Sequence, residues 1–310
     1  MNTITQTLGG LKLGRAAAFR NLAIVPLLAV DEASADYLTL DEALESGAAR
    51  ITEVSESGSV PELSFVNDSD RRILLVDGEE LVGARQNRIL NLTILVGKRQ
   101  KVVIPVSCVE RGRWSYRSRQ FGSAKRTLYA NARAATMQDV SHSMRSSGER
   151  ASDQGRVWES IQRKQRAMNV ESPTEAMGDI YAHRERDVAG YESAFEALPG
   201  QVGALFAVNG KIRGAELFDC PATFAKFLRK ILASYALDAV EEEQPGAATL
   251  PADSEVKAFL AKLQNAPESR FEALAEGVDL RFDCDDTAAA ALVVDTKVVH
   301  LAAFTVDAEV

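Results

Sequence analysis

Two short segments hold most of the side chains that could do chemistry. In residues 78–88 (GEELVGARQNR), Arg85, Gln86, Asn87 and Arg88 follow one another directly. Amides present a paired donor and acceptor that suit a nucleobase or ribose edge, and guanidinium groups present donors that suit phosphate or carboxylate. This run predicts a binding site for an anionic, nucleotide-like ligand. The alternative is that these side chains cap loops or pair with acids elsewhere in the chain.

The second segment, residues 104–114 (IPVSCVERGRW), ends in Arg111, Arg113 and Trp114. Cations that alternate with aromatic rings can hold a phosphate while they stack a flat base, and we therefore add these three residues to the ligand-binding set. Side chains alternate between the two faces of a strand, which puts Cys108 and Glu110 on one face. Because the three histidines lie far away in sequence, a buried Cys108 is favoured over a nucleophile.

Carboxylates near both segments suggest acid–base chemistry. Glu79 or Glu80 together with Glu110 could act as a pair on a glycosidic or phosphate-ester bond. If the protein is an enzyme, Glu79 and Glu110 are the catalytic residues we select, and the polar, glycine-containing residues 141–152 are the loop expected to close over the ligand.

Several kinds of site find no support in the sequence. The cysteines and histidines are scattered, which excludes a credible metal cluster or disulfide framework and favours a reducing cytoplasm. Walker A, GxGxxG, HExxH and GxSxG motifs are missing, and no cofactor is expected.

The charge is unevenly distributed along the chain. Residues 81–133 contain twelve basic residues and one acid, Glu110, for a net charge of +11; because the 310-residue chain carries −8, the remainder carries −19. Such a basic island is suited to holding an anion, or it is a solvated face paired with the acidic remainder. A noncatalytic scaffold and, less favoured because of the overall acidity, an RNA-binding module are the alternative functions.

The pattern of elements predicts an α+β protein with antiparallel sheet. Strands are expected over residues 22–30, 51–54, 62–66, 72–76, 88–96 and 102–109, with hairpins around Asn209-Gly210 and Asp295-Thr296. The apolar run 22–30 contains Pro26 and is interpreted as a strand rather than an export signal. Helices are expected over 40–46 and 123–137, from a start at residues 172–175, and from Pro221 onward.

One architectural prediction links the two segments. The loop 97–101 would return the chain antiparallel, so that strands 88–96 and 102–109 become neighbours. Arg88 would then lie near Glu110, and an ion pair between them is the alternative to a ligand-binding role for both.

Both segments resemble the proteins named for association with ADP-ribosylglycohydrolase and rhodanese-phosphatase genes, and residues 203–218 add a weaker match. The resemblance implies one family domain over residues 8–306, with a β-rich part at 20–115, a helical part at 123–198 and an α/β part at 200–306. The resemblance also implies a role with ADP-ribose or another NAD-derived metabolite. It does not identify any catalytic residues.

Overall fold

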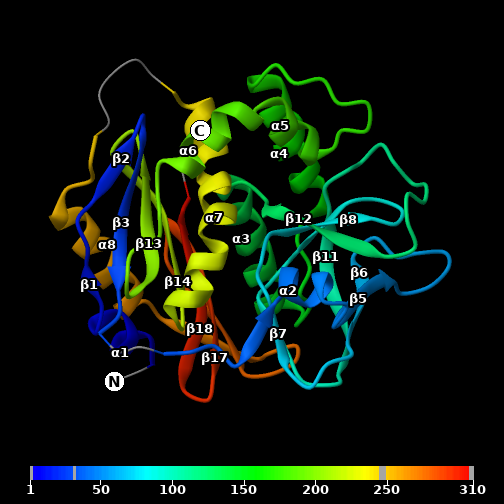
Figure 1. Ribbon diagram of the computed structural model, residues 1–310, viewed down its shortest axis with the longest axis horizontal. Helices are drawn as coiled ribbons and strands as arrows, with labels where there is room; N and C mark the ends of the chain where they lie inside the picture. Colours follow the sequence, from blue (N-terminus) through cyan, green and yellow to red (C-terminus); the bar gives the residue numbers. More distant parts are fainter. Residues whose placement is uncertain (1–2, 31–32, 244–248, 307–310) are drawn as a thin grey trace.

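Antiparallel pairing dominates the strands of this protein, as the hairpin spacing predicts. The computed structural model describes residues 3–30, 33–243 and 249–306. Within these residues, parallel pairing is confined to β4 (Tyr37–Thr39) and β7 (Arg72–Leu75). The strands form a nine-stranded sheet, a closed barrel and a small third sheet, and helices lie between and around them (Figure 1). The α+β class is confirmed.

The nine-stranded sheet is built largely from local hairpins. Asn209 and Gly210, both at positive φ, turn one strand directly into the next, and Asp295 and Thr296 do the same. The strands in sheet order are β1 (Lys12–Leu13), β3 (Leu22–Leu28), β13 (Gln201–Val208), β14 (Lys211–Phe218), β18 (Lys297–Thr305), β17 (Thr287–Val294), β16 (Val278–Phe282) and β15 (Glu268–Glu272), with β2 (Ala17–Phe19) paired to β3.

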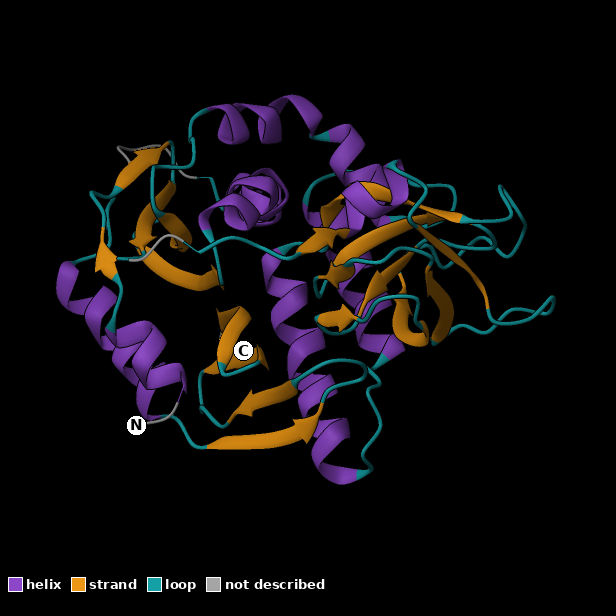
Figure 2. Ribbon diagram, turned by 60° about the horizontal axis from the view of Figure 1, so that its bottom comes forward, coloured by secondary structure: helices purple, strands orange, loops and turns teal. Residues whose placement is uncertain are grey.

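Helices cover both faces of this sheet. On one face lie α1 (Thr3–Gly9) and α8 (Asp253–Asn265), whose apolar side chains share a core with Leu205 and Leu217. On the other face lie α3 (Ala130–Ser146) and α7 (Pro221–Glu241), which pack between the sheet and the barrel (Figures 1 and 2). The apolar stripe of α7, including Phe224 and Phe227, is buried as its helical spacing predicts.

The barrel contains both sequence segments that carry the predicted site. Apolar side chains such as Ile51, Leu90 and Val106 fill its interior. The strands in barrel order are β11 (Lys101–Cys108), β6 (Glu62–Asn67), β5 (Ala49–Glu53), β12 (Phe121–Thr127), β8 (Glu79–Gly83) and β9 (Arg88–Leu90). β9 pairs antiparallel with β11, and Arg88 lies opposite Cys108, which confirms that the two segments are neighbours.

Shorter elements complete the fold. The expected strand 88–96 divides into β9 and β10 (Ile94–Val96), which joins β7 and β4 in the three-stranded sheet. The remaining helices are α2 (Leu40–Glu45), α4 (Gln154–Ala167), α5 (Met177–His183) and α6 (Glu185–Ser193), and α2 has the predicted capping box of Thr39 and Glu42. No helix in the described residues combines the length and the hydropathy that crossing a bilayer requires.

Three expected elements are wrong, and one of them is the helix start at 172–175, which is a turn before α5. Residues 123–127, assigned to a helix, belong to β12, because they pair with β8 across a bulge at which Lys125 has a positive φ. Much of the expected loop 141–152 is the last part of α3, where Ser141 and Ser146 donate to the carbonyls four residues earlier. This helical segment is not a loop that could close over a ligand, and that expectation is dropped.

A buried ion-pair network joins the barrel to the nine-stranded sheet. Arg133 of α3 contacts Asp77, just before β8, and Glu216 of β14. His300 of β18 also contacts Glu216, at 3.0 Å, and its other ring nitrogen lies 2.8 Å from the hydroxyl of Thr93. Burial and the two carboxylates act in opposite directions on the pKa of Arg133, and the carboxylates raise it overall. The guanidinium therefore neutralises two acids in a buried site.

Arg133→Met tests the importance of this network. Removing the cation leaves Asp77 and Glu216 buried without compensation, and we expect the free energy of unfolding to fall by about 3 kcal/mol or more. Arg99→Met is the matched control, because Arg99 forms an exposed pair with Asp70 and its loss should barely move the urea unfolding curve. Equal effects of the two substitutions would contradict the assignment.

Candidate functional site

Strand alternation separates the two glutamates at the start of β8. Glu79 accepts hydrogen bonds from the backbone N–H of Val76, at 2.8 Å, and from Nζ of Lys230, at 2.6 Å. Glu80 points to the opposite face, where it pairs with Arg126 and accepts a hydrogen bond from the Asn87 amide. Asn87 also donates its backbone N–H to Glu110. The carboxylate beside Glu110 is therefore Glu80, which corrects the expected pair of Glu79 and Glu110.

Glu110 lies just beyond the end of β11 and is surrounded by donors. Its Oε2 accepts from Nη2 of Arg113 at 2.6 Å and from the Asn87 N–H at 3.2 Å. Its Oε1 accepts from the Thr174 hydroxyl at 3.0 Å and lies 3.5 Å from Nη2 of Arg117. Burial raises the pKa of Glu110, but Arg113 and the other donors outweigh it, so the pKa is lowered overall. Glu110 is an ionised acceptor at neutral pH.

An open pocket of about 670 Å³ lies over Glu110. Its walls come from the end of β8, the loop after β11, β12 and the start of α5, and its polar lining residues are Asn87, Glu110, Arg117, Arg126, Thr174 and Asp179. This volume falls within the range of small-molecule sites. Arg117 and Arg126 bring guanidinium donors to the same pocket as the acceptor Glu110.

Gly178 of α5 allows Arg126 to reach this position. A Cβ on Gly178 would lie 2.5 Å from Nη2 of Arg126, which is closer than real contacts allow. Arg126 meanwhile holds Glu80 through an ion pair at 2.5 Å and lies over the ring of Tyr181. Burial raises the pKa of Glu80, and the charge of Arg126 opposes that rise. Gly178 thus leaves room for the Arg126 guanidinium in its present position, and a side chain there would force that guanidinium to shift.

The other predicted ligand-binding residues lie outside the pocket. Arg113 is behind Glu110, and Arg111 lies over the ring of Trp158. Arg85 stacks against Trp114 and Tyr116 on the outer surface. The expected ion pair of Arg88 with Glu110 does not form, because Arg113 and Arg117 are the cations that contact this carboxylate.

Gln86, Arg88 and Cys108 form a separate buried group. The Cys108 thiol donates to Oε1 of Gln86 at 3.2 Å, and Nη1 of Arg88 donates to the same oxygen at 2.9 Å. Burial raises the pKa of Cys108, although Arg88 opposes this. Cys108 is fully buried as a protonated thiol, as its apolar neighbours predict.

Four polar residues of the pocket were not selected from the sequence. Arg117 and Arg126 belong to the basic island, which gave no reason to prefer them over its other cations. Thr174 lies in the expected helix start 172–175, which is a turn before α5, because the Ser172 hydroxyl accepts the N–H of Ala176. Asp179 has no distinguishing pattern around it. Their common feature is proximity to Glu110, which only the fold creates.

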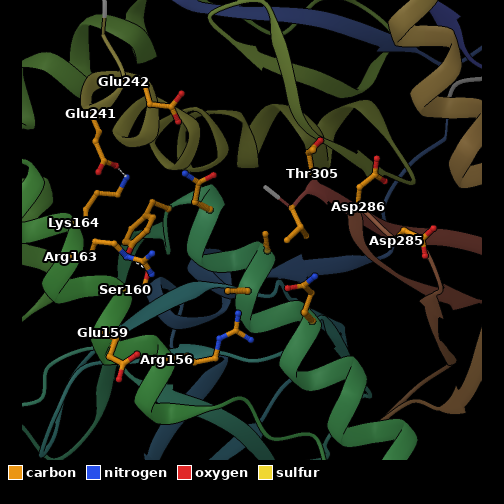
Figure 3. A pocket seen from close by; sticks show the side chains of 16 residues that line it. Arg156, Glu159, Ser160, Arg163, Lys164, Glu241, Glu242, Asp285, Asp286 and Thr305 are labelled. Atoms are coloured by element: carbon orange, nitrogen blue, oxygen red, sulfur yellow. Dashed lines mark hydrogen bonds and ion pairs between the residues drawn. The ribbon is translucent and has the colours of Figure 1, made fainter. Parts of the chain in front are cut away.

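A larger cavity, about 1060 Å³, lies between α3, α4, the end of α7 and the end of β18 and contains none of the predicted residues (Figure 3). Its charged side chains are largely paired within the protein: Lys164 with Asp238 and Glu241, Glu242 with Arg213, and Asp286 with Lys262. Glu159, Arg163 and Asp285 also line this cavity and form no ion pair within the described residues, so the pocket at Glu110 is distinguished by the predicted residues it contains and not by unsatisfied groups.

Glu110→Gln tests whether this carboxylate is held ionised. An acid whose pKa is lower in the folded than in the unfolded chain stabilises the fold above the unfolded pKa, and this contribution disappears as the pH falls through the folded pKa. We expect the variant to be less stable than the wild type at neutral pH, and the difference to shrink as the pH falls below 4.5, the ordinary glutamate value.

Urea unfolding at a series of pH values measures this difference. Glu149→Gln is the control, because Glu149 is exposed and its carboxylate lies outside the pocket. A gap between wild type and Glu110→Gln that stays constant with pH would show that the donors around Glu110 do not hold it ionised.

Comparisons with known proteins agree with the resemblance of the two segments. No curated protein and no solved structure matches the chain. A family model described as the ARG and Rhodanese-Phosphatase-superfamily-associated Protein domain matches residues 10–304, which includes the barrel, the pocket and the nine-stranded sheet. The chain therefore belongs to the ARG and Rhodanese-Phosphatase-superfamily-associated Protein domain family.

Proposed function

We propose that the pocket over Glu110 binds an anionic, ribose-containing nucleotide such as ADP-ribose. The observation that carries the proposal is the meeting of an ionised acceptor, Glu110, with two arginines, Arg117 and Arg126, in one open pocket. A phosphorylated sugar has hydroxyl donors for the first and phosphate acceptors for the second.

The polar groups divide into two kinds along the pocket wall. Glu110 and Asp179 supply carboxylate oxygens, and Asn87 and Thr174 supply neutral polar groups, which together suit the hydroxyls of a ribose. Arg117 and Arg126 supply charge-assisted donors for phosphate. Because cations and carboxylates both line the pocket, a ligand needs hydroxyl and phosphate groups together to satisfy it.

The loop that carries Arg117 also presents aromatic rings. Trp114 and Tyr116 are about half exposed, and they flank Arg85 at 5.4 and 4.4 Å from its guanidinium carbon. Neither ring lines the pocket, so a nucleobase would reach them only by extending past Arg117 along this loop.

Arg117→Ala should weaken ADP-ribose binding by roughly tenfold or more, since a lost charge-assisted hydrogen bond costs about 1.5–3 kcal/mol. Isothermal titration calorimetry measures the change, and Arg117 is suitable because its side chain is 60% exposed and little folding energy depends on it. Arg119→Ala is the matched control, an exposed arginine of the same loop that does not line the pocket.

Two results would reject the proposal. The first is the lack of binding by the wild type to ADP-ribose, its phosphorylated derivatives and NAD at concentrations up to about millimolar. The second is an equal loss of affinity in both variants. Binding to RNA of arbitrary sequence that falls steeply with salt would instead indicate the nucleic-acid function.

A further inference from the structure

Arg126 is held by the protein on one side and is free on the other. Its Nε donates to Glu80 at 2.5 Å, and its guanidinium lies over the ring of Tyr181. Within the described residues Nη1 and Nη2 have no hydrogen-bond partner, and the side chain is 25% exposed and lines the pocket over Glu110. These two nitrogens are therefore free donors in a fixed position, which suits the oxygens of a phosphate.

Asp179 has the same arrangement with the opposite charge. It lies in the first turn of α5, and its Oδ2 accepts a hydrogen bond from the Ser172 hydroxyl at 2.5 Å. No residue of the described chain donates to its Oδ1, and the side chain lines the same pocket. Glu110, by contrast, is already surrounded by four donors. Asp179 is therefore the acceptor that a ligand can reach without displacing a donor of the protein.

Arg126 and Asp179 line one pocket without neutralising each other directly. Nη2 of Arg126 lies against Gly178, the residue before Asp179. Burial lowers the pKa of Arg126, but the charges of Glu80 and Asp179 are among those that raise it overall. The described residues nevertheless contain no ion pair between Arg126 and Asp179. A ligand with a phosphate and hydroxyl groups can join the two, because the phosphate accepts from the guanidinium and the hydroxyls donate to the carboxylate.

The pocket offers little to a nucleobase. Among the described residues, those that line it include no aromatic side chain, and its apolar lining comes from small residues, Val82, Pro173, Ala176 and Ala182. A protein that binds a base usually stacks it on a ring. The volume of about 670 Å³ accommodates a sugar phosphate. The pocket is therefore suited to a ribose and its phosphate, and a base attached through that phosphate would lie outside.

We propose that this pocket recognises a 5-phosphorylated ribose with a free cis diol, whatever base lies beyond the phosphate. The phosphate accepts from Nη1 and Nη2 of Arg126, and the two cis hydroxyls donate to Asp179. The inference rests on the function proposed above, which supplies the ribose, and it adds which part of the ligand is recognised and by which carboxylate. ADP-ribose contains this unit at its free ribose end, and ribose 5-phosphate is the smallest molecule that contains it.

Asp179 also determines which sugar phosphates bind weakly. In 2-deoxyribose 5-phosphate one of the two hydroxyl donors is missing, and in arabinose 5-phosphate the two hydroxyls point to opposite faces of the ring. A site whose acceptor is built for a hydroxyl rejects an analogue that leaves this acceptor unpaired. We therefore expect both analogues to bind roughly tenfold or more weakly than ribose 5-phosphate.

Isothermal titration calorimetry of the full chain with ADP-ribose and these three sugar phosphates tests the inference. Because no ring in the pocket stacks the base, ribose 5-phosphate should bind within about tenfold of ADP-ribose. Equal affinities for ribose 5-phosphate and 2-deoxyribose 5-phosphate would overturn the inference, and the proposed function would stand if ADP-ribose binds. Lack of binding by both ADP-ribose and ribose 5-phosphate would reject the inference together with the proposed function.

Asp179→Asn tests the assignment of the carboxylate. The ratio of the affinities for ribose 5-phosphate and 2-deoxyribose 5-phosphate is the quantity to compare, because a lost negative charge near Arg126 alters phosphate binding equally for both ligands. This ratio should fall toward one in Asp179→Asn and stay at the wild-type value in Asp187→Asn, an acid in the first turn of α6 that does not line the pocket. An unchanged ratio in Asp179→Asn would refute the role of this residue. The ligand series on the wild type remains decisive if Asp179→Asn does not fold.

Discussion

The buried pair of Arg113 and Glu110 is the interaction on which the candidate pocket depends. One guanidinium donates to Glu110, to Oδ1 of Asn87 and to the carbonyls of Ala84 and Ser115. These acceptors belong to the turn between β8 and β9 and to the loop after β11. Without this cation the two segments would lose a common donor and Glu110 would become an uncompensated buried charge. The pair is therefore both the support of the pocket and the cause of its ionised acceptor.

The run of four polar residues at 85–88 shows why composition alone could not define the site. Consecutive residues near a strand point in different directions, so Asn87 lines the pocket while Arg88 points into the barrel. Arg85 leaves the strand altogether and stacks on Trp114. The sequence correctly indicates that this segment is chemically unusual. In the fold, however, its four side chains do not form one site, because one lines the pocket and the others point elsewhere.

Most local signals were read accurately from the sequence, although the expected helix start at 172–175 is a turn, and most of the long-range pairing was not predicted. The Asn209-Gly210 turn and the capping box at Thr39 depend on neighbouring residues only, and both form as predicted. The helix expected from residue 123 fails because β8 supplies backbone partners there. The choice of Glu79 over Glu80 fails for a related reason: sequence alone does not show which face of β8 turns toward Glu110, and the barrel decides it.

The fold shows how the cations of the basic island, residues 81–133, are used. Several of its cations are paired inside the protein: Arg133 with Asp77 and Glu216, Arg113 with Glu110, and Arg126 with Glu80. Others neutralise acids at the surface, such as Arg99 with Asp70 and Lys125 with Glu45. A net charge of +11 in the sequence is therefore not a +11 surface, and long-range attraction of a polyanion is weak.

The cations of the basic island can still bind a ligand through direct contacts, because individual guanidinium groups are held at fixed positions beside carboxylates. Such an arrangement selects a ligand by its pattern of donors and acceptors rather than by its total charge.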